Sequence, residues 1–378
     1  MEDLSIYIHI PFCNSKCYYC DFISFTGQEN KVEAYISSLI TELSLYKKDL
    51  KDYKIKTIFI GGGTPSAIDP IYIYRVLDYL YSNFNTHEDM EVSIELNPGT
   101  LSLEKLNIYK QAGINRVSIG LQTFNNNILG SLGRRHHAEE FFSSLDMVKE
   151  VGFNNINVDL IFGLPDQNLT DGMIDITTLV QLGVHHISYY SLIIEPNTPM
   201  YKWHQEGKLH LMDEDSERKL YHQVKEFLKY EGYVHYEISN FSLDGYQCKH
   251  NMVYWNIKPY LGVGLSSHSY LMGKRFWNTS KLNDYLDSLS EGNLPVEDEE
   301  LISKEIEIAE YCILGLRLIQ GINKREFFNR FGVDLRDIYG HTIEKHKKAG
   351  LLIEDDRYLR LTDRGLDLAN LVEVDFLP

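Results

Sequence analysis

The sequence predicts an α/β fold, namely a partial (β/α)6 barrel followed by a small C-terminal domain that is helical and winged-helix-like. Two observations carry this prediction. Apolar, β-branched runs alternate with amphipathic stretches from residue 5 to about residue 240, a pattern typical of strands and helices that build a parallel sheet. After residue 300 the chain shows helical patterns and one short hairpin pattern. Six strand–helix units suit a complete or partial barrel.

The individual elements follow from this alternation. The expected strands are Ser5–Ile10, Ile55–Ile60, Glu91–Leu96, Arg116–Leu121, Ile156–Phe162 and His186–Ile193. The helices expected between them are Lys31–Lys48, Ile71–Asn83, Leu103–Ala112, Ala138–Val151 and Asp171–Leu182. In the C-terminal part we expect helices at Ile302–Ile319, Lys324–Phe331 and Leu335–Ala349, then a hairpin formed by Leu351–Glu354 and Tyr358–Leu361.

Three parts are expected along the chain: residues 1–240 for the barrel, 241–290 for a barrel extension and 300–378 for the C-terminal domain. The segment Phe241–Trp277 is rich in Gly, aromatic residues and His and is expected to be loop and strand. The acidic stretch Glu291–Glu300 is expected to be a linker. Because the C-terminal domain is also acidic, we interpret it as a packing or partner module rather than a DNA reader.

Bulk properties exclude several classes of protein. A net charge of −17 over 378 residues argues against a nucleic-acid partner, which needs a basic face. The start Met1-Glu2-Asp3 lacks a signal peptide's cationic and apolar regions, and no apolar run reaches the ~18 residues that span a bilayer. We therefore expect a cytoplasmic protein. Peripheral membrane contact and the oligomeric state, a homodimer included, are left open.

Three cysteines close to the first expected strand, Cys13, Cys17 and Cys20, are the strongest chemical signal. Three thiolates on one loop hold three irons of a 4Fe–4S cluster and leave the fourth iron open for a ligand. Zinc is the alternative, but it would require a fourth Cys or His, and His9 on the strand is not directed to the loop. Five cysteines and no sign of secretion disfavour disulfides.

Polar residues also follow the later strands, at the carboxyl ends where parallel β/α folds carry their reactive groups. Glycines after the second strand let the backbone approach a ligand, although a tight turn would use them too. A carboxylate inside the apolar fifth strand is costly unless it is paired or ligand-bound. The presence of such polar residues at the ends of successive strands favours one shared ligand site, although each residue alone could also form an ordinary structural hydrogen bond. The candidates are Gly62, Gly63, Thr64, Glu95, Gln122, Arg134 and Asp159.

Four motifs together resemble the radical S-adenosylmethionine (SAM) superfamily, and within it the oxygen-independent coproporphyrinogen III oxidase group. They are Tyr-Ile-His-Ile-Pro-Phe-Cys, Gly-Gly-Gly-Thr-Pro, Glu-Leu-Asn-Pro and Gly-Leu-Gln-Thr. The resemblance implies that SAM binds the open iron and that an electron from the cluster can cleave it to a deoxyadenosyl radical. It makes Cys13, Cys17 and Cys20 the cluster ligands. It places Tyr7, Gly62, Gly63, Thr64 and Glu95 around this SAM. Gln122, Arg134 and Asp159 match residues that serve a second SAM in the oxidase.

Two departures from the oxidase point to its heme chaperone branch, the HemW type. Phe22 stands where the oxidase has a further Cys, and the chain reaches its first cysteine after a shorter N-terminal arm. That branch also carries the motif His-Asn-x-x-Tyr-Trp, found here at His250, Asn251, Tyr254 and Trp255.

Physically, the motif suits a porphyrin. His is a common axial ligand, Asn can orient the ring, and aromatic side chains offer flat faces. The same residues also fit an ordinary structural corner. Cys248 is an alternative soft ligand or a buried thiol.

The favoured function is therefore a chaperone that binds heme and delivers it to acceptor hemoproteins, with respiratory-chain proteins among the candidates. On this hypothesis the chain carries a 4Fe–4S cluster and SAM and lacks coproporphyrinogen oxidase activity. The first alternative is the oxidase itself, which decarboxylates coproporphyrinogen III through the deoxyadenosyl radical. The second alternative is another radical enzyme that acts on a tetrapyrrole.

Overall fold

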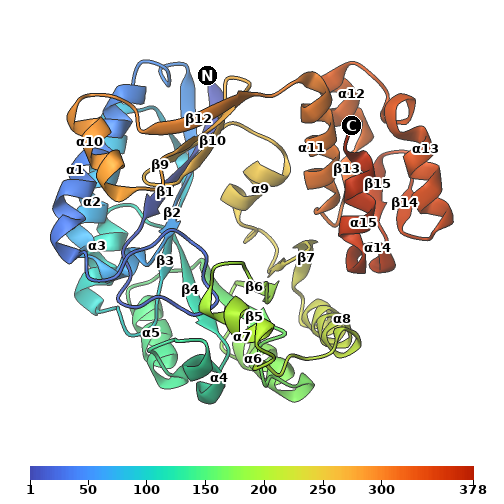
Figure 1. Ribbon diagram of the computed structural model, residues 1–378, viewed down its shortest axis with the longest axis horizontal. Coiled ribbons are helices and arrows are strands. Elements are labelled where there is room, and N and C mark those ends of the chain that lie inside the picture. The colour runs from blue at the N-terminus through green and yellow to red at the C-terminus, as the bar shows by residue number, and fades with distance from the viewer.

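The structure is a computed structural model that describes all residues, 1–378. It has a larger lobe built around one curved sheet and a smaller C-terminal lobe beside it (Figure 1). None of its helices combines the length and the apolar character required to span a bilayer.

Six parallel strands in chain order form the centre of the sheet, and the helices that connect them cover its convex face (Figure 1). The strands are β1 (Glu2–Ile10), β2 (Tyr53–Gly62), β3 (Thr86–Leu96), β4 (Arg116–Gln122), β5 (Ile156–Phe162) and β6 (His186–Ser191). The helices are α1 (Val32–Tyr46), α2 (Pro70–Asn83), α3 (Leu103–Gln111), α4 (Asn126–Ser131), α5 (Ala138–Glu150) and α6 (Leu169–Gln181). The predicted α/β fold class is confirmed. The barrel is partial, because the two outermost strands of the sheet do not pair with each other.

Further strands, all antiparallel to their neighbours except β9, extend this centre on both sides. Next to β1 the order is β9 (Tyr260–Val263), which is parallel to β1, then β10 (His268–Leu271), β11 (Lys274–Asn278) and β12 (Val296–Leu301). At the other edge, β8 (Asn240–Ser242) pairs with β6 and β7 (Val234–Glu237) pairs with β8.

The predicted linker Glu291–Glu300 is wrong in its second half, because the residues from Val296 onward form the edge strand β12. Glu299 pairs with Lys274 and Glu300 with Arg275, both at 2.8 Å, on the neighbouring β11. Cross-strand ion pairs of this kind compensate for a composition that disfavours strands.

Apolar side chains from both faces of the parallel strands form the larger core. Ile8 on β1 and Ile58 on β2, for example, are fully buried in it together with Leu39 of α1 and Leu77 of α2. A second, smaller core lies in the C-terminal lobe and contains Leu316, Phe327, Ile343 and Leu359. The division into residues 1–240, 241–290 and 300–378 stays a prediction.

The C-terminal lobe has the predicted helices followed by the predicted hairpin. It comprises α11 (Lys304–Leu316), β13 (Ile322–Asn323), α12 (Lys324–Phe331), α13 (Leu335–Lys348), β14 (Leu352–Glu354), β15 (Tyr358–Leu361), α14 (Asp363–Asp367) and α15 (Ala369–Glu373). Its three short strands pair in the order β13-β15-β14. Three single 3-10 turns complete the chain, η1 (Glu29–Lys31), η2 (Pro65–Ala67) and η3 (Val374–Phe376).

Seven helices were not predicted: the short helices α4, α14 and α15 given above, and α7 (Pro199–Gln205), α8 (Glu214–Tyr230), α9 (Lys249–Trp255) and α10 (Leu282–Ser290). The helix α9 corrects the prediction that Phe241–Trp277 is loop and strand only, and it lies on the concave side of the sheet (Figure 1).

Distant side chains hold both ends of α9. The Glu91 carboxylate on β3 accepts hydrogen bonds from the backbone N–H groups of Lys249 and His250, at 3.2 and 3.1 Å. At the other end, Arg330 of α12 donates to the carbonyls of Asn256 and Ile257, at 3.2 and 3.0 Å. A carboxylate at the amino end of a helix and a cation at its carboxyl end both stabilise the helix, because each lies next to the end of the helix dipole that has the opposite charge.

Candidate functional site

The cysteine loop leaves the carboxyl end of β1 and is tied at its base by backbone hydrogen bonds. Cys13 N–H donates to the Phe25 carbonyl at 2.9 Å, and Phe25 N–H donates to the Pro11 carbonyl at 2.7 Å. Cys17 and Cys20 lie within the loop that these bonds close. The structure therefore presents all three cysteines on one segment beside the ends of the neighbouring strands.

Glycines at the end of β2 allow this loop to lie against the sheet. Gly62 has a φ of +111°, and a Cβ there would lie 2.5 Å from the His9 ring. Gly63 N–H donates to the Ile10 carbonyl at 2.9 Å, and a Cβ on Gly63 would lie 3.0 Å from the Cys13 sulfur. Any larger residue at these two positions would displace the loop.

A chain of side-chain hydrogen bonds connects the cysteine loop to the ends of β2 and β3. The Thr64 hydroxyl donates to the Cys13 sulfur at 3.4 Å, and Asn97 Nδ2 donates to the Thr64 hydroxyl oxygen at 3.1 Å. Arg134 then donates to Asn97 Oδ1 at 2.9 Å and to the Tyr19 hydroxyl, within the loop, at 3.1 Å. Sequence reasoning missed Asn97 and Tyr19, although Asn97 belongs to the quoted Glu-Leu-Asn-Pro motif.

Arg134 lies beside a small cavity. This cavity has a volume of ≈160 Å³, and its lining includes Cys17, Thr64, Asn97 and Arg134. The Arg134 Nε is buried and has no hydrogen-bond partner. Nearby Tyr19 and the loop thiols raise the pKa of the guanidinium, against the effect of burial, so the side chain stays cationic. A buried cation with an unsatisfied donor is suited to an anionic or polar ligand.

Glu95 on β3 accepts a hydrogen bond from Gly62 N–H at 3.2 Å. Burial and, to a smaller extent, the Asp159 charge raise its pKa to about 8, although the Gly62 N–H and Arg134 act in the opposite direction. Glu95 is therefore largely protonated at neutral pH in this structure, and a hydroxyl or ammonium group of a ligand would shift it toward the carboxylate.

Gln122, the last residue of β4, and Asp159, on β5, differ in their surroundings. Gln122 has a φ of +78°, which is uncommon for a residue with a side chain. A Cβ on Gly120 would lie 3.2 Å from Gln122 Nε2 and 3.4 Å from Arg134 Nη2, so both groups approach one point. Asp159, in contrast, already accepts hydrogen bonds from Ser118 and Asn157, both at 2.8 Å.

Tyr7 and His9 connect β1 to the cysteine loop, which corrects the expectation that His9 is not directed to the loop. The Tyr7 hydroxyl and His9 Nδ1 are hydrogen-bonded at 3.1 Å, and His9 Nε2 bonds the Ile23 carbonyl in the loop at 2.9 Å. Burial raises the pKa of Tyr7 well above its usual range and lowers that of His9. Since both His9 nitrogens have partners, the zinc alternative loses its nearest fourth ligand.

The three thiols themselves are not drawn together. Nowhere in the chain do three or more His, Cys, Asp or Glu side chains lie close enough to hold a metal ion. The remaining cysteines, Cys248 and Cys312, are fully buried away from the loop. Cluster binding at Cys13, Cys17 and Cys20 stays a prediction that rests on their shared loop.

The His-Asn-x-x-Tyr-Trp motif lies on α9, and its His250 is only 1% exposed. Nδ1 is hydrogen-bonded to the Thr57 hydroxyl at 2.7 Å and Nε2 to the Tyr254 hydroxyl at 2.9 Å. Burial lowers the pKa of His250 to about 3, so the ring stays neutral. Neither nitrogen is free to bind iron, and this geometry favours the structural interpretation of the motif.

The structure separates this motif from the cysteine loop. Thr57 precedes Gly62 by five residues on β2, which corresponds to roughly 16 Å along a strand. Aromatic rings fill the interval, with Tyr7 and Phe59 at 6.4 Å and Phe59 and His250 at 5.3 Å between centroids.

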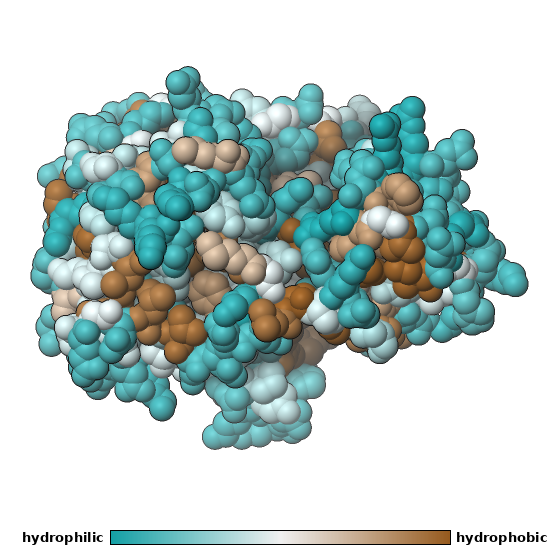
Figure 2. All heavy atoms as spheres, turned by 90° about the horizontal axis from the view of Figure 1, so that it is seen from above, coloured by the Kyte–Doolittle hydropathy of each residue, from teal (hydrophilic) through white to brown (hydrophobic).

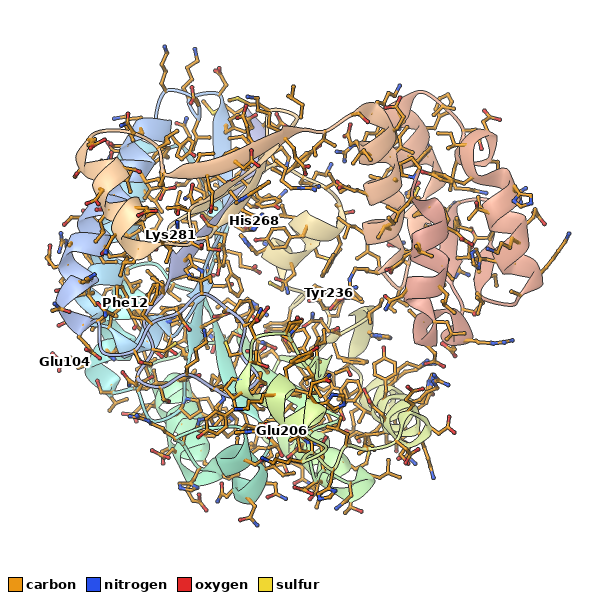
Figure 3. The ribbon with its side chains drawn as sticks, in the orientation of Figure 1. Phe12, Glu104, Glu206, Tyr236, His268 and Lys281 are labelled. Atoms are coloured by element: carbon orange, nitrogen blue, oxygen red, sulfur yellow. The ribbon has the colours of Figure 1, made fainter.

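Of the other motif residues, Asn251 is half-buried and Trp255 is in contact with an arginine side chain. The Arg317 guanidinium lies 4.7 Å from the Trp255 ring centroid. Burial raises the pKa of Cys248 to about 12. Tyr236, labelled in Figure 3, connects α9 to β6 through its hydroxyl. This hydroxyl is hydrogen-bonded to Nε2 of His186 on β6 at 2.8 Å, and it accepts a hydrogen bond from the N–H of Cys248, at the start of α9, at 3.4 Å. Heme contacts by His250, Asn251, Tyr254 and Trp255 stay predictions.

Comparison with known proteins identifies the family. A model of the radical SAM superfamily matches residues 7–175, and a model of the HemN C-terminal domain matches residues 302–368. Heme chaperone HemW of Bacillus subtilis is 37% identical over 376 residues, covering 99% of this chain and 99% of that protein. The chain belongs to the HemW family. Another relative, heme chaperone HemW of Lactococcus lactis, is 37% identical over 378 residues and is covered to 97% of its length.

The HemW assignment confirms the family prediction, which was made from the four motifs, the two departures from the oxidase and the His-Asn-x-x-Tyr-Trp motif. Among solved structures, coproporphyrinogen III oxidase (HemN) from Escherichia coli superposes with a TM-score of 0.86 and 23% identity, covering 99% of this chain and 90% of HemN. This likeness shows a shared fold. Phe22, where the resemblance to the oxidase expects a further Cys, is 62% exposed on the loop.

Proposed function

We propose that the chain binds heme and delivers it to acceptor hemoproteins in the cytoplasm, respiratory-chain proteins among them. The observation that carries this proposal is the 37% identity, over 99% of both chains, to a protein named as a heme chaperone. The presence of Phe22 in place of the further oxidase Cys supports the same choice.

The proposal includes a 4Fe–4S cluster at Cys13, Cys17 and Cys20. The residues fit this group, because the loop supplies three thiols and no fourth cysteine lies nearby. Gly62 and Gly63 leave the space that the loop needs against β2. When bound, such a cluster supplies an electron and an open iron site for SAM.

SAM would lie beside the cluster, in contact with residues at the carboxyl ends of the strands. Thr64 and Arg134 line the small cavity, and Glu95 lies behind Gly62. The unpartnered Nε of Arg134 is a donor for a polar group of this ligand. Asp159 is already engaged by Ser118 and Asn157, which supports one SAM molecule rather than two.

The test compares the two candidate activities in one preparation. The full chain is purified without oxygen and its cluster is reconstituted. Coproporphyrinogen III turnover and heme uptake are then measured side by side, followed by heme transfer to an apo-hemoprotein. We expect about one heme per chain, transfer to the acceptor and no protoporphyrinogen. Turnover to protoporphyrinogen would establish the oxidase alternative and contradict the chaperone proposal.

Cysteine variants provide the matched control for the cluster. Cys17→Ala should abolish the cluster absorption, whereas Cys312→Ala, in the core of the C-terminal lobe, should retain it. Loss of the cluster in both variants would mean that the effect is one of folding and not of ligation.

A further inference from the structure

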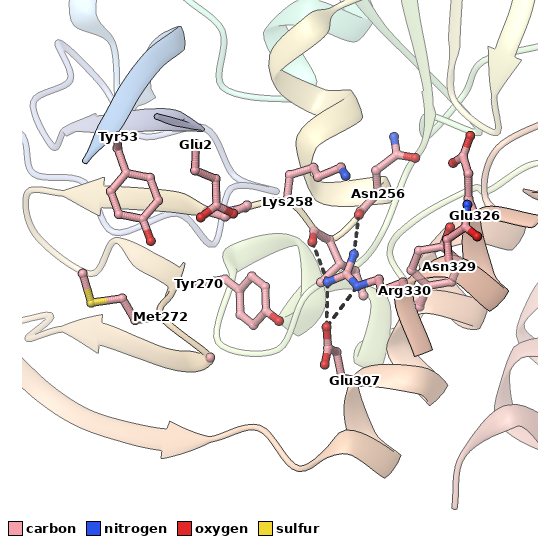
Figure 4. A pocket seen from close by; sticks show the side chains of 14 residues that line it. Glu2, Tyr53, Asn256, Lys258, Tyr270, Met272, Glu307, Glu326, Asn329 and Arg330 are labelled. Atoms are coloured by element: carbon pink, nitrogen blue, oxygen red, sulfur yellow. Dashed lines mark hydrogen bonds and ion pairs between the residues drawn. The ribbon is translucent and has the colours of Figure 1, made fainter. Parts of the chain in front are cut away.

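A large cavity between the two lobes lies outside the site described above. Its volume is ≈700 Å³, within the range of about 300–1,000 Å³ that is usual for small-molecule sites. It lies between the amino ends of β1 and β2, the segment after α9, the β10–β11 turn and the helices α11 and α12 (Figure 4). In the surface view, the molecule is hollowed between its two lobes (Figure 2).

Carboxylates outnumber cations in the walls of this cavity. Glu2, Glu307 and Glu326 come from three different elements, and the cations are Lys258 and Arg330. Arg330 is already occupied, because it donates to Glu307 at 2.7 Å and to two backbone carbonyls at the end of α9. Since the whole chain also has a net charge of −17, the cavity favours a ligand with positive charge.

The carboxylates are spread along the cavity and are not gathered at one point. In Figure 4, Glu2 lies at one end, beside Tyr53, and Glu326 lies at the other. The side chains in these walls do not form a group of three that could hold a metal ion. Separated carboxylates match instead an organic cation whose positive charges are separated in the same way.

Tyrosine rings form the other prominent part of the walls. Tyr53, Tyr270 and Tyr311 come from β2, β10 and α11. Tyr311 is only 8% exposed, and its hydroxyl forms no hydrogen bond with the rest of the chain. Burial and the nearby Glu326 carboxylate raise the pKa of this hydroxyl, so the two groups lie close together. A buried polar group without a partner is suited to a ligand, and tyrosine faces attract ammonium groups.

We propose that this cavity binds a linear di- or triamine, with ammonium groups at Glu2 and Glu326 and methylene groups along the tyrosine rings. This site goes beyond the function proposed above and does not depend on it. Glu2 belongs to the larger lobe and Glu326 to the C-terminal lobe, so the bound amine joins the two lobes. Lys258 is exposed and unpaired, and its charge opposes such a ligand.

Calorimetric titration of the full, cluster-reconstituted chain with spermidine at low salt tests the proposal. Triacetylspermidine has the same carbon–nitrogen chain without the positive charges and is the matched ligand control. We expect one spermidine per chain and no binding of the acetylated compound. A chain that binds neither compound, or binds both equally, would overturn the proposal.

Carboxylate variants test where the amine lies. Glu326→Gln should weaken spermidine binding about threefold, and the double variant with Glu2→Gln about tenfold. The control that removes the same number of charges is Glu150→Gln with Glu305→Gln, since both of these residues are exposed and lie outside the cavity. It should leave the affinity unchanged, and an equal loss of affinity in the two double variants would overturn the placement.

Two further variants test the contacts and the sign of the charge. Tyr311→Phe, which removes only the hydroxyl, should weaken spermidine binding about threefold. Lys258→Met should strengthen it about threefold, whereas the same change would weaken the binding of an anion. Weaker binding of spermidine by Lys258→Met would therefore overturn the assignment of a cationic ligand.

A titration with Mg²⁺ distinguishes a built site from general counterion binding. If Mg²⁺ bound with the affinity of spermidine and lost that affinity in Glu326→Gln, the site would be one for counterions only, which would also overturn the proposal. We expect Mg²⁺ to bind more weakly and to respond equally to the two double variants. Circular dichroism and the cluster absorption of each variant show whether it has folded.

Discussion

Replacing His250 with glutamine should destabilise the protein at neutral pH and have no net effect near pH 5. The imidazole forms one hydrogen bond with Thr57 and one with Tyr254, and it is 1% exposed. Each buried hydrogen bond contributes ~1 kcal/mol to the free energy of unfolding. We therefore expect the wild type to be more stable than His250→Gln by ~2 kcal/mol at about pH 8.

The difference should shrink as the pH falls. Burial lowers the pKa of His250 from 6.5 to about 3 in the folded chain. Since the folded pKa lies below the unfolded one, only the unfolded chain takes up the proton between these values, and stability is lost as the pH decreases. At about pH 5 this loss is ~2 kcal/mol, at 1.36 kcal/mol per pKa unit, which cancels the wild-type advantage.

Urea unfolding of both proteins between about pH 5 and about pH 8 measures this difference. Subtracting the two curves removes the contributions of other buried histidines, whose pKa values are also lowered, such as His186 and His235. Replacement of the exposed His204 by Gln is the control for the substitution itself and should leave the free energy of unfolding at about pH 8 unchanged. A difference that stays constant with pH would refute the view that His250 is a neutral, structural side chain.

Three further predictions follow from the contacts at the two ends of the barrel. The first concerns Glu95→Gln in urea unfolding. Because burial raises the folded pKa of Glu95 to about 8, the wild type should lose ~3 kcal/mol of stability relative to this variant as the pH rises from about 4.5 to about 7. A stability difference that does not change with pH would contradict the burial of Glu95. Arg134→Lys should weaken SAM binding about tenfold in calorimetry, since lysine cannot reach Asn97 and a ligand together; unchanged affinity would place SAM elsewhere. Arg330→Met should lower the free energy of unfolding by ~3 kcal/mol and speed amide exchange in α9, because two carbonyls lose their donor; unchanged exchange would mean that α9 is held by other contacts.

The repeating part of the fold could be predicted from the sequence because its strands are buried on both faces. Runs such as Ile156–Phe162 are mostly apolar, and this run matched the observed strand residue for residue. The order of polar residues after these strands then indicated which side chains meet. This is why Thr64 and Arg134 were predicted to lie near the cysteine loop.

The segments that were missed depend on distant partners. The helix α9 is held by Glu91 and Arg330, which are far from it in the chain. No local sequence pattern therefore predicts this helix. β12 is an acidic strand that forms against Lys274 and Arg275. For the same reason, the sequence alone could not show that Thr57 and Tyr254 are hydrogen-bonded to the two ring nitrogens of His250, and its place in a heme site stays a prediction.

The most direct test of the central claim is Mössbauer and EPR spectroscopy of the anaerobically reconstituted chain, recorded with and without SAM. The three cysteines of one loop predict a 4Fe–4S cluster in which one iron differs from the other three, and SAM should change the signal of that iron. A zinc-only protein, a cluster with four protein ligands, or a spectrum that SAM leaves unchanged would contradict the account.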